Sequence, residues 1–237
     1  MITTNSNKLN FEFLPKKGKD KSPNAKISIG FERTIRVPDD NKRHYLPPSL
    51  GNFPIKHIED YDLGSKNKLK KRGGILIPMF QADALWLSFT HDANYSNYSL
   101  LEDFNIDCSS PIALKVATGK ICAISGNTWS EGLSEKTQNY IVLPEQPWLD
   151  GYNDSKGSVR QFVAAPLGKG LTVEKQLTGN EEIGGIQIQA FPLKKKYYDR
   201  LISKRLEEAK EIAKRRAERA SREQRIEFSR GSPMPEA

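Results

Sequence analysis

The sequence has little cysteine and no long hydrophobic run. Its 237 residues include two cysteines, Cys108 and Cys122, which are too few for a disulfide framework or a cysteine-rich zinc module. No segment approaches the roughly 18 consecutive apolar residues of a membrane-spanning helix. The first residues also lack the apolar stretch of a secretory signal. We therefore expect a cytoplasmic protein whose thiols are reduced.

Arrangements of catalytic or metal-binding residues are also missing from the sequence. The three histidines are isolated from one another, so metal binding would need distant segments to converge; they are His44, His57 and His91. There is no Gly-x-Ser-x-Gly motif, and the run LGKG at 167–170 is too short for a phosphate-binding loop. We expect no catalytic residue, no metal and no cofactor.

The positive charge of the chain is concentrated at its two ends. The formal net charge is +8, to which residues 1–26 contribute +4, residues 194–237 contribute +6 and residues 27–193 contribute −2. Basic ends beside a near-neutral body are typical of contact with nucleic acid, acidic protein or a membrane surface. A solubilising tail would have the same composition.

Short runs with alternating apolar residues occupy the region 27–193. Two of them, 112–117 and 120–124, are separated by Thr118-Gly119, which predicts a β-hairpin because glycine tolerates the positive φ of a tight turn. About nine such runs, joined by Pro- and Gly-rich connectors, predict an all-β body that is either a sandwich or a barrel. The runs are 27–37, 73–79, 84–89, 112–117, 120–124, 140–143, 159–164, 171–176 and 185–191. Residues 91–110 interrupt them as a surface loop with a helical turn at 100–104.

The C-terminal region predicts a long basic helix at 194–230. Residues 197–228 contain no glycine or proline, and their apolar residues recur at spacings of 4, 4, 3, 4, 4 and 3. These residues are Tyr198, Ile202, Leu206, Ala209, Ala213, Ala217 and Ala220. Since the stripe weakens to alanine, we expect its first half to dock on the body or a partner helix and its second half to project into solvent. Glu211 with Arg215, and Glu218 with Arg222, have the spacing of helical ion pairs.

Two groups of residues are candidates for binding. A tryptophan in a Pro/Gly loop beside a carboxylate and an amide can stack on a planar or sugar ligand while the polar groups orient it. This candidate ligand site comprises Gln146, Trp148, Asp150, Tyr152, Arg160 and Gln161. Alternatively, Trp148 closes the end of the sandwich and Asp150 caps a turn. The candidate nucleic-acid or partner-binding residues are Lys204, Lys210, Lys214, Arg215, Arg216, Arg219 and Arg222.

A succession of sequence blocks resembles a family of bacterial and fungal proteins. The blocks are RTIRVPDD (33–40), LPPSLGNFP (46–54), GGILIPMFQADALWLSF (73–89), ALKVATGKICAISG (113–126), YIVLPEQPWLDG (140–151), VRQFVAAPLGKG (159–170) and GGIQI (184–188). The resemblance covers about 33–191. It implies no activity, cofactor or site residue, and the 91–110 loop and the basic helix depart from the family pattern.

These features predict four regions. They are a flexible basic arm at 1–26, the all-β domain at 27–193, the basic helix at 194–230 and a disordered tail at 231–237. We interpret the chain as a non-enzymatic binding or assembly module, in which the body presents a loop surface and the helix engages a partner protein or a second copy. One alternative is association with nucleic acid through the basic arms. The other is an enzyme whose site is assembled from loops around Trp148, Asp150 and Arg160.

Overall fold

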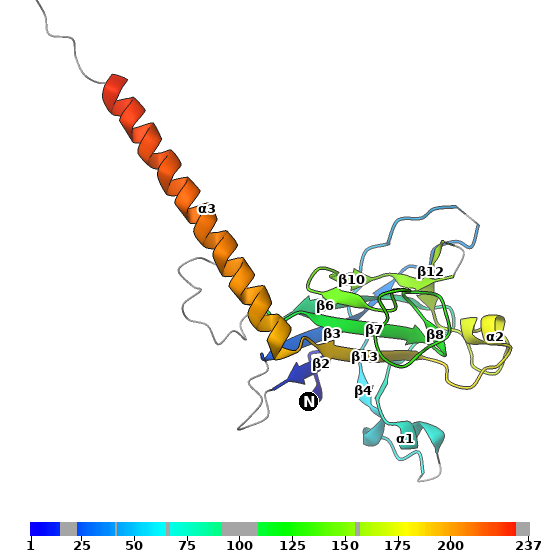
Figure 1. Ribbon diagram of the computed structural model, residues 1–237. Coiled ribbons are helices and arrows are strands. Elements are labelled where there is room, and N and C mark those ends of the chain that lie inside the picture. Colours follow the sequence, from blue (N-terminus) through cyan, green and yellow to red (C-terminus); the bar gives the residue numbers. More distant parts are fainter. Residues whose placement is uncertain (15–22, 41, 65–66, 92–108, 155–156, 231–237) are drawn as a thin grey trace, which may run out of the picture.

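The computed structural model describes residues 1–14, 23–40, 42–64, 67–91, 109–154 and 157–230, with side chains as far as residue 226. In these residues the chain is mostly β, with thirteen strands in antiparallel sheets, and it ends in one long helix, α3 (Lys195–Arg230) (Figure 1). The predicted helical turn at 100–104 and the predicted tail at 231–237 lie outside the described residues.

The larger sheet contains seven strands. Its order is β1 (Ile2–Asn5), β2 (Lys8–Phe13), β3 (Ala25–Thr34), β6 (Ala84–His91), β12 (Val159–Val163) and β11 (Gly151–Asn153), and β10 (Trp148–Leu149) also pairs with β6. Strand β3 and strand β6 form the centre of the sheet and pair along their length, from Ile27 opposite His91 to Thr34 opposite Ala84.

A second sheet of four strands lies against the first. Its order is β13 (Ile186–Pro192), β7 (Ile112–Thr118) and β8 (Ile121–Cys122), and β9 (Ile141–Leu143) also pairs with β7. The predicted hairpin is confirmed, since Thr118 pairs with Ile121 and Gly119 has a φ of 58°. The short elements β4 (Lys56–His57), η1 (Ile58–Asp60), α1 (Lys68–Arg72), β5 (Ile75–Leu76) and α2 (Val173–Thr178) lie outside the two sheets.

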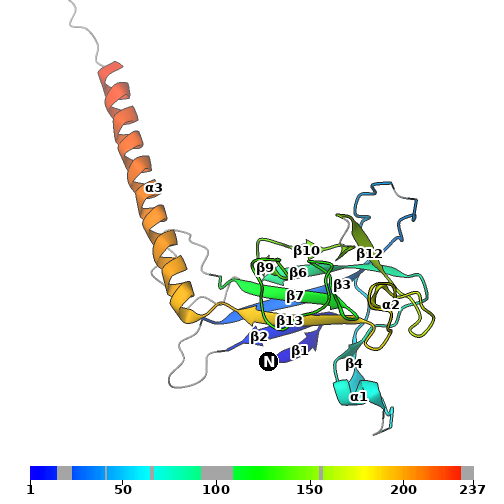
Figure 2. The same cartoon turned by 45° about the vertical axis from the view of Figure 1, so that its right-hand side comes forward.

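The two sheets share one hydrophobic core. Ile27 and Leu87 of the larger sheet and Leu114 and Val116 of the smaller sheet belong to the same cluster, and each is fully buried. Because side chains alternate between the two faces of a strand, each sheet turns one apolar face toward the other. Figure 2 shows the two layers, with β7 and β13 of the smaller sheet in front of β3. This packing explains the period-two pattern of the sequence.

The expectation of a flexible arm at 1–26 is wrong for the part that the structure describes. Strands β1 and β2 form a hairpin, and β2 pairs with β3 from Lys8 opposite Gly30 to Phe13 opposite Ala25. Leu9 and Phe11 are buried in the core. Pairing with β3 gives this short, polar segment a template that its own sequence does not supply.

Two further predictions need correction. The sequence predicts a strand at 171–176, but residues 173–178 form α2. The hydroxyl of Thr172, just before the helix, accepts a hydrogen bond from Lys175 N, and Gly179 ends the helix in the left-handed conformation. In the run 73–79, only β5 is a strand. Both segments lie in connections between strands of the two sheets: Ile75 and Ile77 pack against the core, whereas Leu171 and Leu177 are exposed.

Helix α3 is confirmed, and it extends away from the β body in both views (Figures 1 and 2). Near its start Tyr198 and Ile202 are buried, with 2% and 6% of their surface exposed. From Lys210 to Ile226 every residue is exposed. No helix in the described part of the chain has the length and apolar character needed to cross a membrane.

Candidate binding surfaces

The candidate ligand site is divided between two pairs of strands. Trp148 lies in β10 opposite Ser88 of β6, whereas Tyr152 lies in β11 opposite Arg160 of β12. The predicted loop is therefore mostly strand. Trp148 is 46% exposed, so its ring is available at the surface and does not close the end of the sheets.

Arg160 and Gln161 hold the chain segment that follows β3. The guanidinium of Arg160 lies 2.8 Å from the carboxylate of Asp39 and 3.4 Å from that of Asp154. The Gln161 side chain accepts a hydrogen bond from Val37 N and donates one to Ile35 O, both at 3.0 Å. These contacts occupy the polar groups that the sequence assigned to a ligand.

The remaining residues of the candidate ligand site, Tyr152, Gln146 and Asp150, have three different environments. The ring of Tyr152 packs against that of Phe162, with centroids 6.3 Å apart, and burial raises the pKa of the Tyr152 phenol. Gln146 donates a 2.7 Å hydrogen bond to the backbone carbonyl of Trp148. Asp150 is half-buried and has no hydrogen bond or ion pair with a described residue. The six residues therefore share a region without converging on one ligand.

The structure also contains a buried lysine that the sequence analysis missed. Lys115 of β7 is fully buried, and its ammonium donates to the carbonyls of Ser130 and Gly132 at 2.5 and 2.7 Å. The same ammonium lies 4.2 Å from the centroid of the Trp129 ring. The Asn139 side chain binds the same loop through Ser134 N and Gly132 O. The lysine thus organises a loop over the outer face of the smaller sheet.

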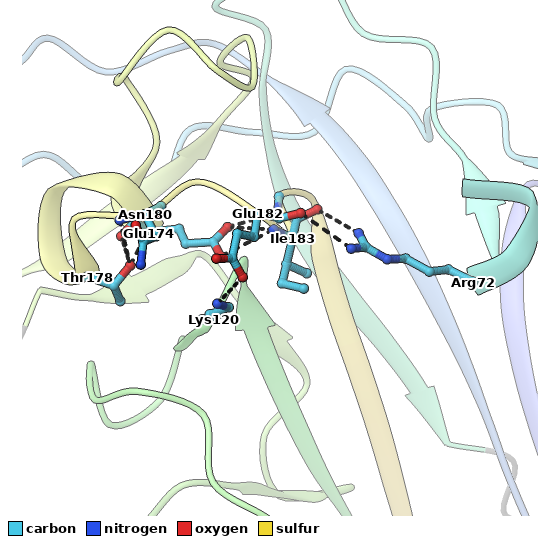
Figure 3. A network of polar contacts seen from close by, with 8 residues as sticks. Arg72, Lys120, Glu174, Thr178, Asn180, Glu182 and Ile183 are labelled. Carbon is cyan, nitrogen blue, oxygen red and sulfur yellow. Dashed lines mark hydrogen bonds and ion pairs between the residues drawn. The ribbon is translucent and has the colours of Figure 1, made fainter. Parts of the chain in front are cut away.

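A second buried charge, Glu174 of α2, holds the turn before β13 (Figure 3). Its carboxylate accepts hydrogen bonds from Ile183 N at 3.2 Å and Gly184 N at 2.9 Å. In the same network, Lys120 binds the Glu182 side chain, and Arg72 donates to the backbone carbonyl of Glu182. The network joins α1, α2 and the β7–β8 turn.

A third polar cluster lies at the outer face of the larger sheet. The Glu32 carboxylate accepts hydrogen bonds from Ser88 Oγ at 2.7 Å and from Ser49 Oγ at 2.6 Å. Gly30 leaves room for this cluster, because a Cβ there would lie 2.4 Å from Ser88 Oγ. Glu32 therefore joins β3 and β6 to the chain near residue 49.

Some sequence signals could have located these groups. Lys115 alternates with Ala113 and Ala117, and small residues on the outward side of a strand indicate that another segment covers it. Thr172 and Gly179 have the spacing of a helix start and end, which would have placed Glu174 on a helix. No sequence pattern indicates the partners of Glu32, because they lie 17 and 56 positions away.

The exposed part of α3 carries several ion pairs within the helix. Their distances are 3.7 Å for Lys204–Glu208, 3.0 Å for Arg215–Glu211 and 2.8 Å for Arg219–Glu223. The expected pair of Glu211 with Arg215 is confirmed, whereas Glu218 and Arg222 form no ion pair with a described residue. Lys210, Lys214 and Arg216 also have no ion-pair partner among the described side chains.

Similarity to known proteins assigns no function to these surfaces. Comparisons with protein-family models, with curated proteins and with solved structures find no match. Within the described ranges, no group of three or more histidine, cysteine, aspartate and glutamate side chains is placed to hold a metal ion.

Proposed function

We propose that this protein is a binding module in which a sandwich-like β body holds α3, and the exposed half of α3 engages an anionic partner. The observation that carries the proposal is the exposure of every residue from Lys210 to Ile226 in a continuous helix. A helix that buries no face against its own domain, and is rich in cations, is suited to contact another molecule.

The start of α3 supports this role. Tyr198 and Ile202 are buried and pack with Leu206 of the same helix and with Leu193, whose N–H donates a 3.1 Å hydrogen bond to the carbonyl of Pro111 in the body. Favourable i,i+4 ion pairs and strong helix formers support the exposed turns, which gain no stability from packing against the body. The helix thus begins directly after β13, buries side chains only in its first turns and projects beyond them.

The polar side chains of the body hold other segments of the chain in place, which favours a structural role for them. Arg160 and Gln161 hold the segment after β3, and the buried side chains of Lys115 and Glu174 bind backbone groups of nearby loops. Side chains engaged in this way are poorly placed to bind a ligand as well. We therefore place the binding surface on α3 and not on the strands around Trp148.

Site-directed photo-crosslinking tests this proposal. A p-benzoylphenylalanine in place of Ala213 places the probe on exposed α3, and the same probe in place of Phe80, which is 81% exposed on the body, is the matched control. After irradiation of cells that make the full chain, we expect macromolecular adducts from position 213 and few from position 80. Nuclease and protease digestion then identify the class of partner.

Two outcomes would contradict the proposal. Adducts that are equally abundant at the two positions would mean that α3 is not the preferred contact surface. The absence of adducts at position 213 would mean that α3 has no stable partner. A chain ending at residue 206 retains β1, β2, Tyr198 and Ile202, and should therefore remain folded while losing the partner.

A further inference from the structure

The exposed half of α3 has two sides of different charge. Ala209, Ala213, Ala217 and Ala220 lie along one side, following the helical repeat of 3.6 residues. Each alanine has a cation as its immediate neighbour in sequence. Since successive residues are about 100° apart around a helix, these cations flank the alanine stripe. Lys210 and Lys214 lie on one flank, and Arg216 and Arg219 lie on the other.

The acidic residues lie mainly on the opposite side. Between positions 207 and 226 there are five glutamates, and helical geometry places four of them away from the alanines: Glu207, Glu208, Glu211 and Glu218. Two of these glutamates pair with cations of their own side, Lys204 and Arg215. The fifth, Glu223, pairs with Arg219. Three of the four flanking cations, Lys210, Lys214 and Arg216, therefore keep an uncompensated charge among the described side chains.

This charge pattern argues against self-association through the alanine side. If two copies met there, the cationic flanks of one helix would face those of the other, whether the helices ran parallel or antiparallel. Like charges at such positions destabilise helix pairs. Alanine also contributes little apolar area, and the side offers no large anchor of the kind that a protein groove binds.

We propose that the alanine side of α3 lies in the major groove of double-stranded DNA, where the cations that flank it bind the phosphate backbone. This inference rests on the proposed function, because it names the partner of the same helix. The major groove is about 12 Å wide and admits an α-helix. Small alanines allow close approach to the floor of the groove, and the flanking cations reach the phosphates on either side.

The contacts are independent of base sequence. The alanine side chain has no hydrogen-bond donor or acceptor with which to read a base edge, whereas Lys210, Lys214, Arg216 and Arg219 meet phosphates. Four phosphate contacts give a slope of about −3.6 in a plot of log K against log salt concentration. The affinity should therefore fall steeply with salt and change little between duplexes of different sequence.

A comparison of two triple variants of the full-length chain tests the inference. The variant K210Q/K214Q/R216Q removes three cations from the alanine side, and R215Q/R222Q/R225Q removes three cations from the opposite side with the same change in net charge. Glutamine has a helix propensity close to that of lysine and arginine, so both variants should retain the helix, which circular dichroism checks. Binding to a 20-base-pair duplex of mixed sequence is measured by fluorescence anisotropy across a salt series.

We expect K210Q/K214Q/R216Q to bind about 100-fold more weakly at 0.15 M salt, with a slope reduced by about 2.7, and the opposite-side variant to lose less than about 5-fold. Equal losses of duplex affinity in both variants would overturn the inference. It would also be overturned if the unmodified chain bound polyglutamate as tightly as the duplex. If photo-crosslinking at position 213 yields protease-sensitive, nuclease-resistant adducts and no duplex binds, the DNA inference fails while the proposed function stands. If position 213 yields no adducts and no duplex binds, both fail.

Discussion

The N-terminal hairpin β1–β2 is integral to the fold, and truncation of Phe11 tests how much the hairpin contributes to the free energy of unfolding. Phe11 lies in β2 between Ile2 and Ile27 of the neighbouring strands, and only 8% of its surface is exposed. Truncation of a buried phenylalanine to alanine removes its transfer free energy and leaves a cavity, which costs about 3–5 kcal/mol. Because folded domains have unfolding free energies of about 5–15 kcal/mol, Phe11→Ala should remove a large fraction of the stability.

Urea denaturation, followed by tryptophan fluorescence, measures this loss. The matched control is Phe80→Ala, because Phe80 is the same residue type with 81% of its surface exposed. We expect a change of less than about 0.5 kcal/mol for the control and an unchanged urea slope for both variants. If Phe11→Ala and Phe80→Ala shifted the midpoint equally, the hairpin would not be packed in the core, and the first strands would belong to a flexible arm after all.

Two other predictions concern charged side chains. Lys115→Met keeps an apolar chain but leaves two carbonyls without their donor, so we expect a loss of about 2–4 kcal/mol in urea denaturation, compared with less than about 0.5 kcal/mol for the exposed control Lys136→Met. The hydrogen bond from Lys120 lowers the pKa of Glu182 below its usual range. A lowered carboxylate pKa contributes stability that is present above about pH 4.5 and is lost as the pH falls through the folded-state value. Glu182→Gln should therefore reduce the loss of stability between about pH 5 and pH 3; an unchanged pH profile would contradict this assignment.

The candidate surfaces differ in how far the sequence could predict them. The cations of α3 are neighbours in the sequence, so helical geometry alone determines which of them share a side with Ala209 and Ala213. The residues around Trp148 are different, because their partners come from distant segments. Gln161 binds the backbone at Ile35 and Val37, more than 120 positions away, and no local pattern of residues indicates that contact.

The sequence by itself determined the elements whose stability depends on local order. Helix α3 follows from its helix-forming residues and the 4, 4, 3 spacing, and the β7–β8 hairpin follows from alternation around Gly119, whose positive φ the turn requires. The residues that favour each of these elements lie next to one another in the chain, so the sequence alone indicates them.

Only the tertiary structure decided those features that depend on contacts with distant segments of the same chain. Strand β2 is ordered because β3 supplies its hydrogen bonds, and β1 in turn pairs with β2. Lys115 is buried because a later loop supplies carbonyls for its ammonium. A polar segment or a charged side chain has no local reason to become buried, since desolvation opposes it. Only groups brought together by the folded chain compensate that cost.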